Sequence, residues 1–201
     1  MITIVDYGLG NLGSIKNMFK RIGASAEVTN DLETISNAQK ILLPGVGKFD
    51  AAMERINSTG LKDVLNKKAL VEKIPVLGIC LGMQLLTNRS EEGKHKGLGW
   101  IDAEAYRFKQ DINLKVPHMG WNVVKQSTPS QLTDQLDDES RFYFVHTYYV
   151  RVKDESNSIL KTHYSHEFDS AIQSDNIFGA QFHPEKSHKY GMKLLRNFAE
   201  L

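Results

Sequence analysis

Short apolar runs alternate with segments of helical spacing through the first half of the chain. The runs predict strands over residues 2–5, 24–28, 40–43 and 75–79. Between the first two runs, apolar residues recur at every third or fourth position and predict a helix with one apolar face, capped by Asn11. Further helices are expected from about Leu32, Lys48 and Leu61. This alternation is typical of β-α-β units that build a parallel sheet.

Beyond residue 97 the pattern changes to runs that favour antiparallel strands. These runs cover residues 98–108, 116–124, 141–152, 158–163, 170–172 and 177–182, and helical spacing returns only near the C-terminus. We therefore expect one α/β domain over residues 1–201, with a mixed, mainly parallel central sheet flanked by helices and added antiparallel strands in the C-terminal half.

The composition changes this picture little but excludes several functions. The 201 residues are 41% hydrophobic and 24% charged, which suits one sizeable core, and 25 basic against 24 acidic residues give a formal charge of +1. This balance indicates neither a nucleic-acid partner nor a membrane surface. No apolar run reaches the roughly 18 residues of a spanning helix, and the start of the chain lacks a secretory pattern, so we expect a cytoplasmic protein. The single cysteine agrees with a reducing compartment.

That cysteine lies in the sharpest local motif of the sequence. Cys80 is flanked by Gly78 and Gly82, after an apolar strand and before a helical segment. This is the pattern of a nucleophile elbow, in which the turn leaves the central residue strained and exposed and a Cβ at either flanking position would collide with the turn. The start of the helix would favour the thiolate. The alternative is a buried cysteine that serves only as a small hydrophobe.

A candidate base and its orienting group follow a hundred residues later. Pro184 restricts His183 to an extended backbone, so the side chains of His183 and Glu185 would point to the same side. A carboxylate beside an imidazole fixes its tautomer and stabilises the imidazolium. Taken alone, the pair also fits a structural histidine with a solvated glutamate. Together with the elbow, it predicts a catalytic triad of Cys80, His183 and Glu185.

The segment Pro44-Gly45-Val46-Gly47 follows an earlier parallel strand and could approach Cys80 at the same sheet edge. Peptides flanked by glycine rotate at little steric cost. We expect the N–H of Val46 or Gly47 to form an oxyanion hole together with the N–H of Leu81. The alternative is an ordinary strand-to-helix turn.

With these residues in place, the chain resembles the class I glutamine amidotransferases, and most closely the glutaminase subunits of imidazole glycerol phosphate synthase. The likeness runs from end to end in residues 6–11 (DYGLGN), 43–50 (LPGVGKFD), 78–84 (GICLGMQ), 116–122 (VPHMGWN), 144–149 (FVHTYY) and 181–187 (QFHPEKS). The elbow and the His-Pro-Glu motif belong to the whole class, whereas the first and fourth segments single out the glutaminase subunit.

The resemblance implies a flavodoxin-like fold and hydrolysis of L-glutamine to glutamate and ammonia, without a cofactor. It implies that the glutamine is held by Gly47, Gln84, Thr147 and Tyr148. It further implies a heterodimer with a (β/α)8 synthase (cyclase) subunit, which receives the ammonia for histidine biosynthesis. By the same resemblance Asn11, Trp121 and Lys186 would lie at or near the subunit interface, and hydrolysis would stay slow until the partner binds its ligand.

Two features leave alternatives open. Residues 99–104 (GWIDAE) place a bulky aromatic and two acids where the family usually has small or aliphatic residues, which puts the identity of the ammonia acceptor in doubt. The same glutaminase chemistry could feed a paralogous synthase of surface-sugar biosynthesis, or the chain could be a non-catalytic docking or regulatory subunit. His163 and His166 have metal-ligand spacing, but no Cys, Asp or Glu completes the set, so we expect no metal site.

Overall fold

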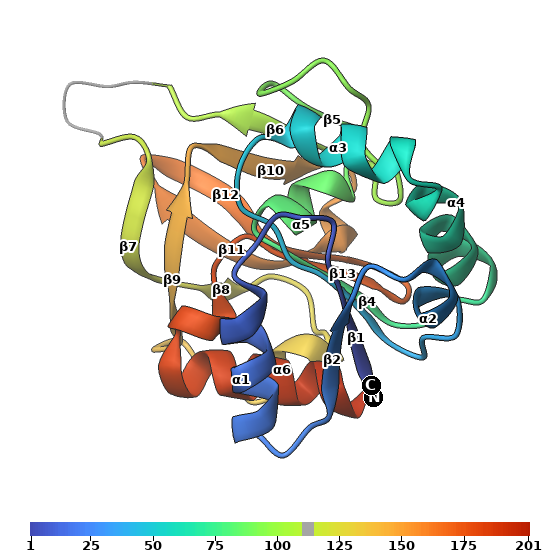
Figure 1. The fold of residues 1–201 in the computed structure, drawn as a ribbon. Helices are drawn as coiled ribbons and strands as arrows, with labels where there is room; N and C mark the ends of the chain where they lie inside the picture. The colour runs from blue at the N-terminus through green and yellow to red at the C-terminus, as the bar shows by residue number, and fades with distance from the viewer. Residues whose placement is uncertain (110–114) are drawn as a thin grey trace.

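The computed structural model describes residues 1–109 and 115–201. One large sheet crosses the molecule, and five of its strands run parallel in the order β2-β1-β3-β4-β13 (Figure 1). These strands are β1 (Ile2–Val5), β2 (Ala26–Thr29), β3 (Ile41–Leu43), β4 (Val76–Ile79) and β13 (Ile177–Ala180). The sheet continues through β12, β10, β6 and β5, while β11 pairs with β12 and β8 pairs with β11. The mixed, mainly parallel α/β architecture expected from the sequence is thus confirmed.

Apart from the short β5, the added strands come from the C-terminal half and are mostly antiparallel, as expected. They are β5 (Arg89–Ser90), β6 (Ala103–Arg107), β8 (Lys125–Gln126), β10 (Tyr148–Val152), β11 (Ser158–Tyr164) and β12 (His166–Ser174). Two details differ from the sequence-based expectation. The run over 141–152 breaks at Thr147 into two strands, and the first of them, β9 (Arg141–His146), leaves the large sheet to pair with β7 (His118–Val123).

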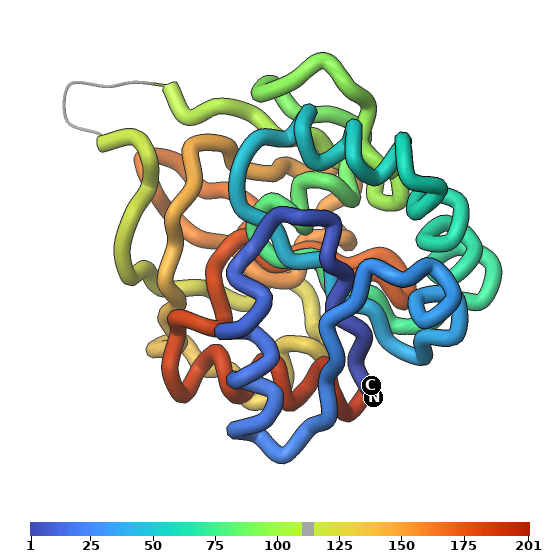
Figure 2. The backbone as a smooth tube through the Cα atoms, viewed as in Figure 1, coloured from blue at the N-terminus to red at the C-terminus, as the bar shows by residue number. Residues whose placement is uncertain are grey.

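Helices cover both faces of the parallel strands (Figure 2). They are α1 (Leu12–Arg21), α2 (Leu32–Ser36), α3 (Phe49–Ser58), α4 (Leu61–Asn66), α5 (Leu81–Leu85) and α6 (His188–Glu200). α1 and α6 pack together over one face, where the core includes Leu42 and Leu77. The other four helices pack over the opposite face, where it includes Ile41 and Leu43. Successive strand residues thus enter opposite cores, which explains why these strands read as continuous apolar runs.

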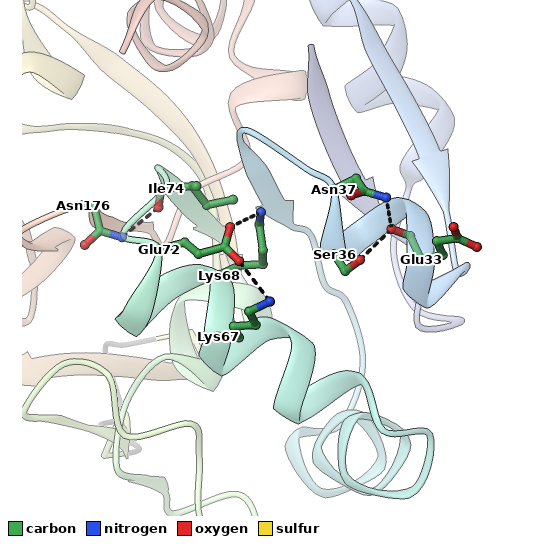
Figure 3. A network of polar contacts seen from close by, with 8 residues as sticks. All are labelled: Glu33, Ser36, Asn37, Lys67, Lys68, Glu72, Ile74 and Asn176. Carbon is green, nitrogen blue, oxygen red and sulfur yellow. Dashed lines mark hydrogen bonds and ion pairs between the residues drawn. The ribbon is translucent and has the colours of Figure 1, made fainter.

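Polar contacts fix the amino-terminal ends of β4 and β13. α4 continues as a π-helical turn, η1 (Lys67–Val71), in which the buried Lys68 pairs with Glu72. Figure 3 shows this pair and the nearby amide of Asn176, which donates to the carbonyl oxygens of Ile74 at 2.7 Å and Ala69 at 2.9 Å. The amide ties the entrance of β13 to that of β4, so the two strands hold a fixed register toward their carboxyl ends.

Within residues 1–109 and 115–201, no helix is both long enough and apolar enough to span a bilayer.

Candidate active site

The carboxyl ends of β3, β4 and β13 carry three of the segments that the sequence analysis singled out. The strands are parallel neighbours, with Leu43 paired to Gly78 and Ile79 paired to Ala180. Residues 44–47 follow β3, Cys80 follows β4, and the segment with His183 and Glu185 follows β13. Because parallel strands end at one edge of the sheet, these segments are brought together there.

Cys80 forms the elbow between β4 and α5. Its backbone has φ +55° and ψ −109°, a region that L-residues rarely occupy. A Cβ on Gly78 would lie 2.6 Å from the backbone of Gly82, so the turn itself requires this glycine. A Cβ on Gly82 would instead lie 1.9 Å from the carbonyl oxygen of Leu43, on the neighbouring strand. The expected strain is present, but the second glycine serves strand packing rather than the turn.

The cysteine is less exposed than the elbow pattern suggested. Only 7% of Cys80 is accessible, because other segments wall it in. A cavity of about 370 Å³ borders it, lined by Val46, Gly47, Cys80, Leu81, Gln84, Glu92, Pro117, Val145, His146, Thr147, Tyr148, His183 and Lys186. Every residue that the sequence analysis assigned to the triad, the oxyanion hole or glutamine binding lines this cavity, except Glu185, which lies behind His183.

His183 and Glu185 form a buried pair. His183 has the expected extended backbone, whereas Glu185 lies in a 3-10 turn, η4 (Pro184–Lys186), and not in an extended chain. The Nδ1–H of His183 donates to Glu185 Oε1 at 2.8 Å, and each side chain is 3% exposed. This bond leaves Nε2 as the nitrogen that can exchange protons at the cavity.

Two opposing effects set the charge of His183. Burial lowers the pKa of the imidazole, but the interactions with Cys80 and Glu185 outweigh it and raise the pKa to about 9. At neutral pH the ring therefore carries a proton that it can donate to a leaving amine. Cys80 and His183 line the same cavity, and their interaction is one of the two that raise this pKa.

The turn after β3 is held in place by Tyr7, whose hydroxyl donates to the carbonyl oxygen of Pro44. Burial and the proximity of Cys80 raise the pKa of Tyr7, so its proton stays on the oxygen. Gly47 has φ +111°, which a residue with a side chain would adopt only under strain. The turn thus has an anchored start and a permissive end, which lines the same cavity as Cys80.

Gln84 and Gln181 join the cavity wall to the sulfur. The Gln84 amide donates to the carbonyl oxygen of Tyr148 and to Gln181 Oε1, both at 3.2 Å. The Gln181 amide lies 3.8 Å from Cys80 Sγ. The sequence analysis missed Gln181, Tyr7 and Glu92. Tyr7 and Gln181 lie in quoted motifs and Glu92 lies in none, and the chemistry of all three depends on contacts across the fold.

The three residues assigned to an interface lie outside the cavity or at its rim. Lys186 lines the cavity and its ammonium lies 5.6 Å from the centroid of the Tyr143 ring. Trp121 is 45% exposed, contacts the edge of the same ring and stacks on His188. Asn11 is exposed before α1 and makes no side-chain capping bond, contrary to the capping role expected from the sequence.

The unusual 99–104 segment has a structural explanation. Trp100 is buried, and its indole N–H donates to Asn66 Oδ1 at 2.8 Å. Asp102 pairs with Lys153 and Glu104 with Arg89. None of these residues lines the cavity, so the segment bears on packing and not on the site.

Comparison with known proteins agrees with the geometry. The family described as glutamine amidotransferase class-I matches residues 3–201. A protein of Methanococcus maripaludis named imidazole glycerol phosphate synthase subunit HisH 2 is 59% identical over 98% of each chain. A Pseudomonas aeruginosa protein of the same name is 49% identical over the whole of both chains. Among solved structures, one described as a glutamine amidotransferase has a TM-score of 0.76 at 17% identity and covers 99% of this chain and 97% of its own, which supports the fold.

Proposed function

This chain belongs to the class I glutamine amidotransferases, and from that premise we propose that it is the glutaminase subunit of an imidazole glycerol phosphate synthase. The observation that carries the proposal is the strained Cys80, which lines one cavity together with His183 of the buried His183–Glu185 pair. Relatives named as this subunit, at 41% to 59% identity over nearly the full chain, support the choice within the family.

Hydrolysis proceeds in two steps. The Cys80 sulfur attacks the side-chain amide carbon of glutamine, and His183 donates its proton to the departing ammonia. Backbone N–H groups of Leu81 and of Val46 or Gly47 stabilise the oxyanion. His183 then removes a proton from water, whose oxygen attacks the thioester, so that glutamate is released, the sulfur leaves as the thiolate and the imidazole is charged again. Glu185 holds the imidazole in the required tautomer through both steps.

The cavity supplies contacts for an α-amino acid. Gly47, Gln84, Thr147 and Tyr148 line the wall where the substrate would bind. Glu92 adds a carboxylate at the same wall, and its Oε2 also accepts from the N–H of Phe49 at 3.0 Å. A carboxylate at this place can pair with the α-ammonium group of glutamine and so reject uncharged amides.

The ammonia must reach its acceptor without mixing with water, which would protonate it. We therefore place the synthase subunit, a (β/α)8 barrel, over the face with Trp121 and Lys186, with Asn11 at its margin. This proposal includes a heterodimer, a cytoplasmic location and a role in histidine biosynthesis. The alternative acceptor, a paralogous synthase of surface-sugar biosynthesis, uses the same glutaminase site.

One experiment separates these possibilities. Glutamate formation is measured for the chain alone, with the histidine-pathway synthase subunit, and with that subunit plus its nucleotide ligand, in each case beside Cys80→Ala. We expect hydrolysis that rises with the liganded partner and vanishes in the variant, while both proteins still bind the partner. Hydrolysis by a chain that the histidine-pathway subunit neither binds nor stimulates would favour the sugar pathway. Binding without hydrolysis under any condition would indicate a docking subunit.

A further inference from the structure

Two buried histidines outside the triad contact each other at the wall of the cavity, which His146 lines. His118 on β7 and His146 on β9 are paired in register, and His118 Nδ1 lies 2.9 Å from His146 Nε2. At one end of the pair, His146 Nδ1 lies 2.8 Å from the carbonyl oxygen of Tyr148. At the other end, His118 Nε2 lies 3.2 Å from Asn122 Nδ2. The contacts form one continuous chain from β7 to the cavity wall.

Backbone carbonyls fix the donor and the acceptor of every hydrogen bond in this series. A carbonyl oxygen only accepts, so His146 must carry its proton on Nδ1 and present a lone pair on Nε2. His118 then donates from Nδ1 to that lone pair. The orientation of the Asn122 amide is set independently, because its Nδ2 also donates to the carbonyl oxygen of His163 at 3.0 Å. Asn122 therefore donates to His118, which donates to His146, which donates to Tyr148.

Both imidazoles are neutral at physiological pH. Burial lowers the pKa of His118 to about 4. For His146, burial and the two neighbouring histidines outweigh the bond to Tyr148 and lower the pKa to about 3. Aromatic packing holds the rings in place, since His118 stacks between Phe144 and Tyr164 with centroid distances of 4.7 and 3.9 Å.

The chain ends on an atom of the proposed glutamine-binding wall. The Tyr148 carbonyl that accepts from His146 also accepts from Gln84, and Gln84 connects through Gln181 to the Cys80 sulfur. Tyr148 is the first residue of β10, where it pairs with Arg107 of β6, and the carbonyl oxygen of the preceding Thr147 accepts from the N–H of Phe108 at 3.1 Å. These backbone bonds hold the start of the strand, and the imidazole bond adds a side-chain restraint on the Tyr148 carbonyl itself.

We propose that His146, locked in its Nδ1–H tautomer by His118, is a positioning residue that fixes the Tyr148 carbonyl and thereby the glutamine-binding wall. The inference rests on the proposed glutaminase function. It predicts that loss of the Nδ1–H donor weakens glutamine binding more than it slows the chemical step, because no atom of the triad is removed.

Two substitutions separate the donor from the ring. His146→Phe keeps an aromatic ring among Phe108, Phe144 and Phe168 but removes the donor. His146→Asn removes the ring but places an amide N–H close to the position of Nδ1. With the liganded synthase partner, we expect the phenylalanine variant to raise KM for glutamine about tenfold, with a smaller change in kcat. We expect the asparagine variant to restore KM to within about threefold of wild type.

A second measurement needs no variant. Nitrogen chemical shifts of histidine labelled with ¹⁵N report the tautomer of each ring, and we expect Nδ1–H for both His118 and His146 at neutral pH. The inference is overturned by an Nε2–H or charged ring at either position, by an unchanged KM in His146→Phe, or by an equal rise of KM in both variants. A wild-type complex that hydrolyses no glutamine would count against the proposed function instead. The tautomers of His118 and His146 would still decide whether the series of hydrogen bonds from Asn122 to Tyr148 exists.

Discussion

The backbone strain at Cys80 can be measured by removing its cause. A residue with a Cβ at φ +55° and ψ −109° costs on the order of 1–3 kcal/mol. For glycine the same angles are as accessible as their mirror image, which lies in the extended region. We therefore compare Cys80→Gly with Cys80→Ala, since both variants lack the sulfur and differ only in the Cβ.

The expected magnitude follows from two opposing contributions. Relief of strain stabilises the glycine variant by about 1–3 kcal/mol, and the greater freedom of glycine in the unfolded chain costs about 0.5–1 kcal/mol. The free energy of unfolding should therefore be about 1 kcal/mol higher for Cys80→Gly than for Cys80→Ala. In a chain of 201 residues this difference corresponds to a rise in Tm of about 2–4 °C.

Equilibrium unfolding in urea measures the difference directly. A matched control is Ala180→Gly, at a buried strand position beside the elbow without a positive φ, where glycine should lower stability by roughly 1 kcal/mol. If Cys80→Gly is no more stable than Cys80→Ala, then the elbow stores no strain and this reasoning is refuted.

Three further predictions concern the triad, the elbow and pH. Glu185→Gln should lower kcat for glutamine hydrolysis roughly 10²- to 10⁴-fold with little change in KM, because an amide cannot stabilise the imidazolium, and steady-state kinetics showing an unchanged kcat would contradict this. Gly82→Ala should lower the free energy of unfolding by at least about 2 kcal/mol, because the new Cβ would overlap the Leu43 carbonyl. Gly13→Ala, in open space on α1, should raise the free energy of unfolding by up to about 1 kcal/mol. Urea unfolding of both variants tests this contrast. Burial lowers the pKa of His146 from 6.5 in the unfolded chain to about 3 in the folded protein. Its contribution to the free energy of unfolding is therefore complete above pH 6.5 and falls by about 1.4 kcal/mol per pH unit between pH 6.5 and pH 3. His146→Phe should flatten this acid limb in urea midpoints measured from pH 7 to 4.5, and an unchanged slope would show that the ring is not buried in its neutral form.

Hydrophobic patterning and local motifs predicted the parallel strands and the candidate catalytic residues at their carboxyl ends. Of the strands in the first half, β1, β3 and β4 are fully buried and β2 is half-buried, and the apolar runs predict all four to within two residues. The motifs around Cys80 and His183 were readable because a strained turn and an X-Pro bond restrict the backbone locally. The parallel sheet then places both segments at one edge.

The parts that the sequence did not reveal depend on partners distant along the chain. The run over 141–152 reads as one strand, yet Thr147 breaks it, and strand pairing alone decides that β9 joins β7. Gln181 contacts Cys80 and Glu92 reaches the cavity only after folding. The 3-10 turn that carries Glu185 was also missed, since the His-Pro-Glu spacing fits an extended chain equally well.

The central claim is that the Cys80 sulfur, activated beside His183, cleaves the amide of glutamine. Its most direct test is the initial rate of glutamate formation by the partner-bound chain, measured for wild type, Cys80→Ala and Cys80→Ser at equal and verified folding. We expect turnover with the wild type, none above background with alanine, and a severe loss with serine, whose hydroxyl is a far weaker nucleophile. Wild-type rates in the alanine variant would show that the reaction takes place without this sulfur.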